Sequence, residues 1–79
     1  MEEKQWWTFT FGYGQKYEGM YVKIYGTLDS TRKIMFERYG QEWAFQYSEA
    51  EWRDWENRRP QYIIETLLEE IEEKGNNNE

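Results

Sequence analysis

Carboxylates are the side chains of this sequence that could do chemistry, because the chain holds 16 Asp and Glu residues but no His and no Cys. Without imidazole or thiolate groups, Ser-His-Asp and Cys-His catalytic units, thiol redox chemistry and ordinary zinc sites are excluded. Paired carboxylates catalyse acid–base reactions only in a water-excluding pocket, and a domain of 79 residues has little room for one. We therefore expect a non-enzymatic protein with no catalytic residue, no cofactor and no metal site.

The charge of the chain is concentrated in its C-terminal part. Residues 1–47 carry six acidic and six basic side chains, whereas residues 48–79 carry ten acidic and four basic ones. The second segment therefore accounts for the whole net charge of −6, which is typical of an acidic module on a neutral body. The acidic residues predicted to contact a partner are Glu49, Glu51, Asp54, Glu56, Glu65, Glu69, Glu72 and Glu73.

Two helices are predicted to carry these carboxylates. Ser48 and Glu51 match the S-x-x-E capping box and open a helix over 48–57. Pro60 suits the first turn of a last helix over 60–74, whose apolar stripe would be Ile64, Leu67, Leu68 and Ile71. The opposite face of that helix would hold a row of carboxylates roughly 5–6 Å apart, from Glu65, Glu69, Glu72 and Glu73. Such a row resembles the phosphates of a nucleic-acid strand in charge and pitch, although a solvated face that keeps the domain soluble is the plainer interpretation.

The chain also carries 16 aromatic side chains, more than a core of this size easily holds. Most of them are expected to form the core, because large rings let few residues bury enough area. Exposed rings would serve as contact residues, since Trp and Tyr commonly dominate binding at protein interfaces. The candidates are Tyr13 and Tyr17 in the glycine-containing loop and Trp55 in the first acidic helix.

Residue alternation and turn signals predict the scaffold. Strands are expected over 6–11, 20–25 and 43–47, and a helix with Thr27 as its N-cap is expected over 28–39. With the two acidic helices, the element order is β-β-α-β-α-α. This order predicts one α+β domain of residues 1–74 with a three-stranded antiparallel sheet, followed by a disordered tail of residues 75–79.

Direct nucleic-acid binding and membrane insertion are disfavoured. The basic residues of the first segment are balanced in number by neighbouring acids, so they make no phosphate-binding surface. No apolar run approaches the ~20 residues of a membrane span, and the first residues lack the basic-then-apolar order of a signal peptide. The absence of Cys fits a reducing compartment, so a cytoplasmic location is expected.

Four segments together resemble small uncharacterised proteins of bacteriophages and mobile elements: the aromatic strand 7–11 (WTFTF), its turn 12–14 (GYG), the helix entry 26–27 (GT) and the strand 43–47 (WAFQY). The resemblance spans residues 6–55. It implies a setting in which short acidic proteins inhibit host defence, as anti-CRISPR proteins and anti-restriction DNA mimics do. The leading prediction is a phage-encoded protein–protein inhibitor whose acidic helices occupy the basic nucleic-acid-binding cleft of a host nuclease, such as a CRISPR effector, in the host cytoplasm.

Two other functions remain open. One is a homodimeric small-molecule binder that sequesters a planar, nucleotide-like ligand on its aromatic sheet face and glycine loop. Lys16, Lys23 or Arg32 would then contact a phosphate group of the ligand. The other is a structural or assembly subunit, which would oligomerise and show no inhibitory activity.

Overall fold

The computed structural model describes residues 3–61 and 65–72 of the chain. Its helices and strands are β1 (Gln5–Thr10), β2 (Met20–Gly26), α1 (Leu28–Tyr39), β3 (Phe45–Tyr47), α2 (Glu49–Arg58) and β4 (Thr66–Glu72). The predicted α+β class is confirmed, and α1 begins and ends at the predicted residues with Thr27 as its N-cap. The tail predicted over 75–79 lies outside the described residues.

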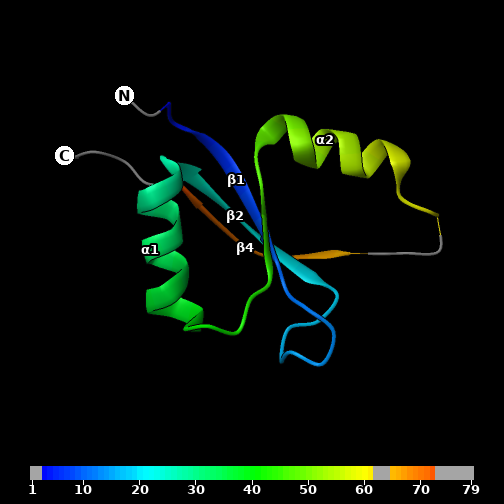
Figure 1. Ribbon diagram of the computed structural model, residues 1–79, viewed down its shortest axis with the longest axis horizontal. Helices are drawn as coiled ribbons and strands as arrows, with labels where there is room; N and C mark the ends of the chain where they lie inside the picture. The colour runs from blue at the N-terminus through cyan, green and yellow to red at the C-terminus, as the bar shows by residue number, and fades with distance from the viewer. Residues whose placement is uncertain (1–2, 62–64, 73–79) are drawn as a thin grey trace.

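The strands form one mixed sheet in the order β3-β1-β2-β4, with α1 and α2 on opposite sides of it (Figure 1). β1 pairs antiparallel with both β2 and β3. β4 is added at the far edge and pairs parallel with β2. The predicted sheet of three antiparallel strands is therefore corrected to four strands, one of which is parallel to its neighbour.

β4 lies where the last helix is predicted, so the helix over 60–74 is wrong for Thr66–Glu72. Leu68 and Ile71 are three residues apart, as on a helical stripe, yet both pack against the core from a strand. A register shift in the pairing of β4 with β2 makes this possible, because it inserts one extra residue into β4. The backbone groups on the outer edge of the buried strand β2 need hydrogen-bond partners, and this requirement outweighs the helix propensity of Leu and Glu.

The side of the sheet under α1 is a closed apolar core. Its fully buried side chains are Phe9 from β1, Val22 and Ile24 from β2, and Met35 from α1. Trp43, which precedes β3, also belongs to this core, with its ring centroid 5.1 Å from that of Phe9. Burial of each large apolar side chain contributes roughly 1.5–3 kcal/mol of transfer free energy. This face therefore supplies most of the hydrophobic stabilisation.

The side of the sheet under α2 is built differently. Trp52 of α2 is 5% exposed and packs its ring on Tyr21 and Tyr47, with centroids 4.9 and 5.5 Å away. The helix packs mainly on β1 and β3. The half of this side formed by β2 and β4 is therefore only partly covered, and side chains there face outward.

Candidate functional site

The acidic side chains of α2 are mostly engaged in local contacts. Glu51 Oε1 accepts a hydrogen bond from the Ser48 backbone N–H at 2.9 Å, and Ser48 Oγ accepts one from the Glu51 N–H, which confirms the capping box. Glu49 Oε2 accepts a hydrogen bond from the backbone N–H of Trp6 at 2.9 Å and so ties α2 to β1. Asp54 forms an exposed ion pair with Arg58 one turn later, at 2.8 Å. Three of the four predicted contact acids of α2 thus hold the helix in place as well as carrying charge.

Glu65 and Trp55 are joined to each other rather than left free for a partner. Trp55 Nε1–H donates a hydrogen bond to Glu65 Oε1 at 2.9 Å, and Arg59 pairs with the same oxygen at 3.2 Å. The Glu65 side chain is only 16% exposed. These contacts fasten the chain after α2 at the start of β4, so both residues act in the scaffold.

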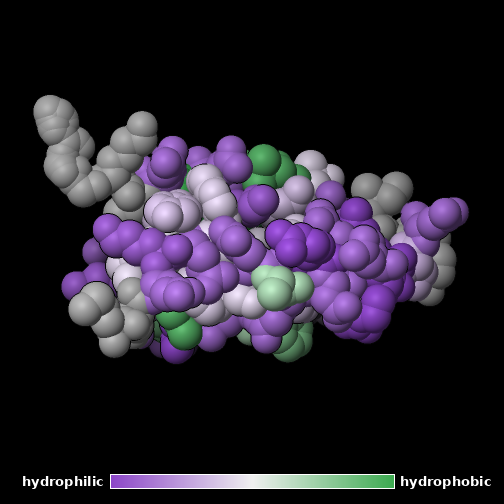
Figure 2. All heavy atoms as spheres, turned by 90° about the horizontal axis from the view of Figure 1, so that it is seen from above, coloured by the Kyte–Doolittle hydropathy of each residue, from purple (hydrophilic) through white to green (hydrophobic). Residues whose placement is uncertain are grey.

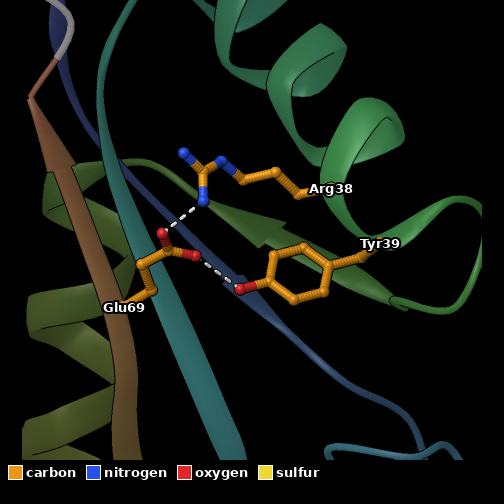
Figure 3. A network of polar contacts seen from close by, with 3 residues as sticks. All are labelled: Arg38, Tyr39 and Glu69. Atoms are coloured by element: carbon orange, nitrogen blue, oxygen red, sulfur yellow. Dashed lines mark hydrogen bonds and ion pairs between the residues drawn. The ribbon is translucent and has the colours of Figure 1, made fainter.

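Glu69 forms the centre of a network that joins β4 to the last turn of α1 (Figure 3). Its Oε1 accepts a hydrogen bond from the Tyr39 hydroxyl at 2.7 Å, and its Oε2 forms an ion pair with the Arg38 guanidinium. Burial raises the pKa of Tyr39 well above its ordinary value of 10.0, and the hydrogen bond to Glu69 raises it further. Glu69 therefore belongs to the α1 side of the sheet.

The predicted row of carboxylates does not form, because a strand places successive side chains on opposite faces. Glu69 pairs in register with the buried Val22 and lies on the α1 side, whereas Glu70 pairs with Lys23 and Glu72 with Tyr25 on the α2 side. Glu73 lies outside the described residues. The acidic residues that share a face are thus Glu70 and Glu72, both exposed.

The uncovered half of the α2 side combines aromatic rings with charges. Trp6 and Tyr25 are neighbours across β1 and β2 and make an edge contact with their ring centroids 5.5 Å apart. Lys23 Nζ lies 5.8 Å from the centroid of the Trp6 ring, a cation–π distance. Viewed from the side that carries α2, the surface is strongly hydrophilic at the end where the helix lies, and paler surface adjoins it (Figure 2). We call the surface formed by Trp6, Tyr25, Glu49, Glu56, Glu70 and Glu72 the acidic–aromatic face.

A pocket of about 200 Å³ opens on this side, between α2 and the sheet. It is lined by two indole rings, a threonine, two cations and two carboxylates: Trp6, Trp52, Thr8, Lys23, Arg53, Glu49 and Glu56. A wider hollow follows the outer surface of α1, but it is a shallow strip beside an exposed helix. The glycine loop contributes no residue to the pocket under α2.

The two candidate tyrosines of the glycine loop have different environments. Tyr13 is 97% exposed and lies next to Gly14, whose φ of 87° permits the tight turn. Tyr17 instead packs in an aromatic group with Phe11 and Tyr39, at centroid distances of 5.4 and 5.5 Å. Tyr13 is therefore free for a contact, whereas Tyr17 closes the end of the core.

Trp6, Tyr25 and Glu70 are the members of the acidic–aromatic face that the sequence prediction omits. The alternation of β1 and β2 already predicts that Trp6 lies on the other face of its strand from Trp7, and Tyr25 on the other face of its strand from Ile24. Glu70 is missed because it lies off the carboxylate row of a helix, while the two-residue period of a strand pairs it with Glu72. A prediction based on the two-residue period of a strand would have placed Glu70 on the same face as Glu72.

Among residues 3–61 and 65–72, no group of three acidic residues is arranged to hold a metal ion, and no helix has the length and apolar character needed to cross a membrane. Comparison with known protein families, with curated proteins and with solved structures found no match to this chain. The assignment of function therefore depends on the geometry of the site.

Proposed function

We propose that this protein is a non-enzymatic inhibitor that binds another protein through its acidic–aromatic face and occupies that protein's nucleic-acid-binding surface. The partner class is a defence nuclease such as a CRISPR effector, and the inhibitor is phage-encoded. The observation that carries the proposal is the strand alternation of β4, which puts Glu70 and Glu72 on the same side as α2. Carboxylates from two elements then flank the rings of Trp6 and Tyr25.

The composition of this face suits a protein partner with a basic surface. Aromatic rings supply apolar contact area at the centre of an interface, and charges at its rim steer association and select the partner. Four carboxylates surround the rings, against the two cations Lys23 and Arg53. Such a face repels phosphate and attracts Lys and Arg, so a nucleic-acid-binding channel is a better partner than nucleic acid itself.

Purified nucleases test the proposal directly. The protein is titrated into cleavage and DNA-binding assays of a panel of CRISPR effectors and restriction nucleases, at low and at high salt. We expect inhibition of at least one of them, weakening as the salt concentration rises. The variant Glu70→Lys/Glu72→Lys should inhibit about tenfold or more weakly, because it reverses two charges at the contact.

The matched control is Glu37→Lys/Glu42→Lys, which makes the same change of charge at exposed residues at and after the end of α1. It should inhibit like the natural sequence. If both double variants lose inhibition equally, net charge and not the acidic–aromatic face is responsible. If no nuclease of the panel is inhibited, the proposal fails.

A second candidate function is small-molecule binding, with a second copy of the chain covering the open half of the α2 side. The pocket between α2 and the sheet supports it, because indole rings and Lys23 lie together there. Its volume of about 200 Å³ is below the roughly 300–1,000 Å³ of common ligand pockets, so one copy does not hold a whole nucleotide. Titration with adenosine monophosphate, with tryptophan fluorescence as readout, tests a nucleotide ligand, and light scattering tests the dimer; a flat titration and a monomer would reject a dimer that binds a nucleotide.

A further inference from the structure

We propose that the pocket between α2 and the sheet binds a small zwitterion of the α-amino-acid class, with a planar or apolar side chain. This inference rests on the second candidate function and is independent of any protein partner.

The walls of the pocket favour a flat ligand of modest size. Trp6 of β1 and Trp52 of α2 both line the pocket, and Trp6 is the more exposed of the two, because the Trp52 ring already packs on Tyr21 and Tyr47. Indole faces bind aromatic and alkyl groups by stacking and dispersion. A volume of about 200 Å³ suits one ring with short substituents.

The charges that line the pocket are balanced but not paired with one another. Neither Lys23 nor Arg53 forms an ion pair among the described residues, and neither does Glu56. One carboxylate oxygen of Glu49 accepts a hydrogen bond from the backbone N–H of Trp6. Glu56 would repel a purely anionic ligand, and Lys23 and Arg53 would repel a purely cationic one. A ligand with both a carboxylate and an ammonium group satisfies both signs at once.

Thr8 gives the pocket a polar floor. Thr8 is 1% exposed, yet it lines the pocket. A ligand group that hydrogen-bonds the Thr8 hydroxyl gains affinity. A hydroxyl both donates and accepts, and therefore suits either charged end of the zwitterion.

Three compounds with the same phenyl ring test the inference by isothermal titration calorimetry: phenylalanine, phenethylamine, which lacks the carboxylate, and hydrocinnamate, which lacks the ammonium group. We expect phenylalanine to bind about tenfold or more tightly than either of the others, the loss expected for one charge-assisted hydrogen bond. Two variants assign the charges. Lys23→Met/Arg53→Gln should lower the affinity for phenylalanine to that for phenethylamine, and Glu56→Gln should lower it to that for hydrocinnamate. Glu37→Gln, on the outer surface of α1, is the control.

The outcomes separate this inference from the function on which it rests. If the three compounds bind equally, or if adenosine monophosphate binds and phenylalanine does not, the zwitterion is wrong while small-molecule binding stands. If none of the four compounds binds at millimolar concentration, both proposals fall. Circular dichroism of each variant shows whether a lost affinity reflects a lost fold.

Discussion

The two sides of the sheet use the same strands for different purposes. Under α1, Phe9, Val22, Ile24 and Met35 are fully buried, and β4 closes the edge through Glu69. Under α2, the alternate residues of the same strands are a tryptophan, threonines, tyrosines and a lysine, and α2 packs mainly on the β1 and β3 half. Stability and contact are thus divided between the two faces, because successive residues of one strand point to opposite sides of the sheet.

The largest expected effect comes from the closed side. Phe9→Ala should lower the free energy of unfolding by about 3–5 kcal/mol, because it removes a fully buried ring and leaves a cavity. Tyr25→Ala on the open side should cost no more than about 1 kcal/mol. Urea denaturation followed by circular dichroism measures both variants. Similar losses of unfolding free energy for Phe9→Ala and Tyr25→Ala would contradict the conclusion that the α1 side supplies the stability and the α2 side is open.

A smaller effect is expected where the two sides meet in β4. Glu69→Ala should cost about 1–3 kcal/mol, because the half-buried Tyr39 hydroxyl loses its acceptor and Arg38 its ion pair. The adjacent Glu70→Ala, on the open side, should stay within about 0.5 kcal/mol. Urea denaturation of these neighbouring variants tests the assigned faces of β4. A larger loss for Glu70→Ala would mean that β4 is turned the other way.

The attachment of α2 is expected to contribute still less. Ser48→Ala should cost about 1 kcal/mol, because the capping box with Glu51 is lost. Ser48→Asp keeps an N-cap acceptor and should retain most of the stability. Thermal unfolding of the two variants provides the test. Equal losses for Ala and Asp would show that the hydrogen bond from the Glu51 N–H is not what stabilises the start of α2.

The smallest effect at neutral pH is expected for Tyr39→Phe, about 0.5–1.5 kcal/mol for one hydrogen bond. Above pH about 10 the difference becomes informative, because Tyr39 ionises in the unfolded chain while its raised pKa keeps it protonated in the folded one. The folded state then binds more protons, so stability falls as the pH rises through this range. Urea denaturation at several alkaline pH values should show a shallower fall for Tyr39→Phe. An unchanged pH dependence would assign the fall to other tyrosines.

Local signals predicted part of this fold correctly. The residues of α1 and the caps at Thr27 and Ser48 follow from hydrogen bonds between residues a few positions apart, which the sequence displays directly. The same holds for the alternation of β1 and β2. The strand predicted over 43–47 is corrected to Phe45–Tyr47, because Trp43 lies before β3 and packs on Phe9, away from the face of Phe45 and Tyr47.

The candidate site was predicted less well than the fold. Tyr13 is exposed as expected, and the acids of α2 lie on its helix. Trp55 and Glu65 are bonded to each other, and Glu69 is bonded to α1, so they are not the free contacts that were predicted. Each of these contacts joins segments that only the folded chain brings together, and carboxylate spacing alone could not reveal them.

The sequence by itself determined the acidic C-terminal part, the exclusion of His and Cys chemistry and the helices that begin at a capping box. Tertiary structure alone decided that Thr66–Glu72 is a strand and which side each of its carboxylates faces. The physical reason is that β4 pairs with β2, more than forty residues earlier in the chain, and the register of that pairing sets the direction of every side chain. Leu, Glu and Ile at these spacings suit a helix or a bulged strand, and the unpaired edge of β2 selects the strand.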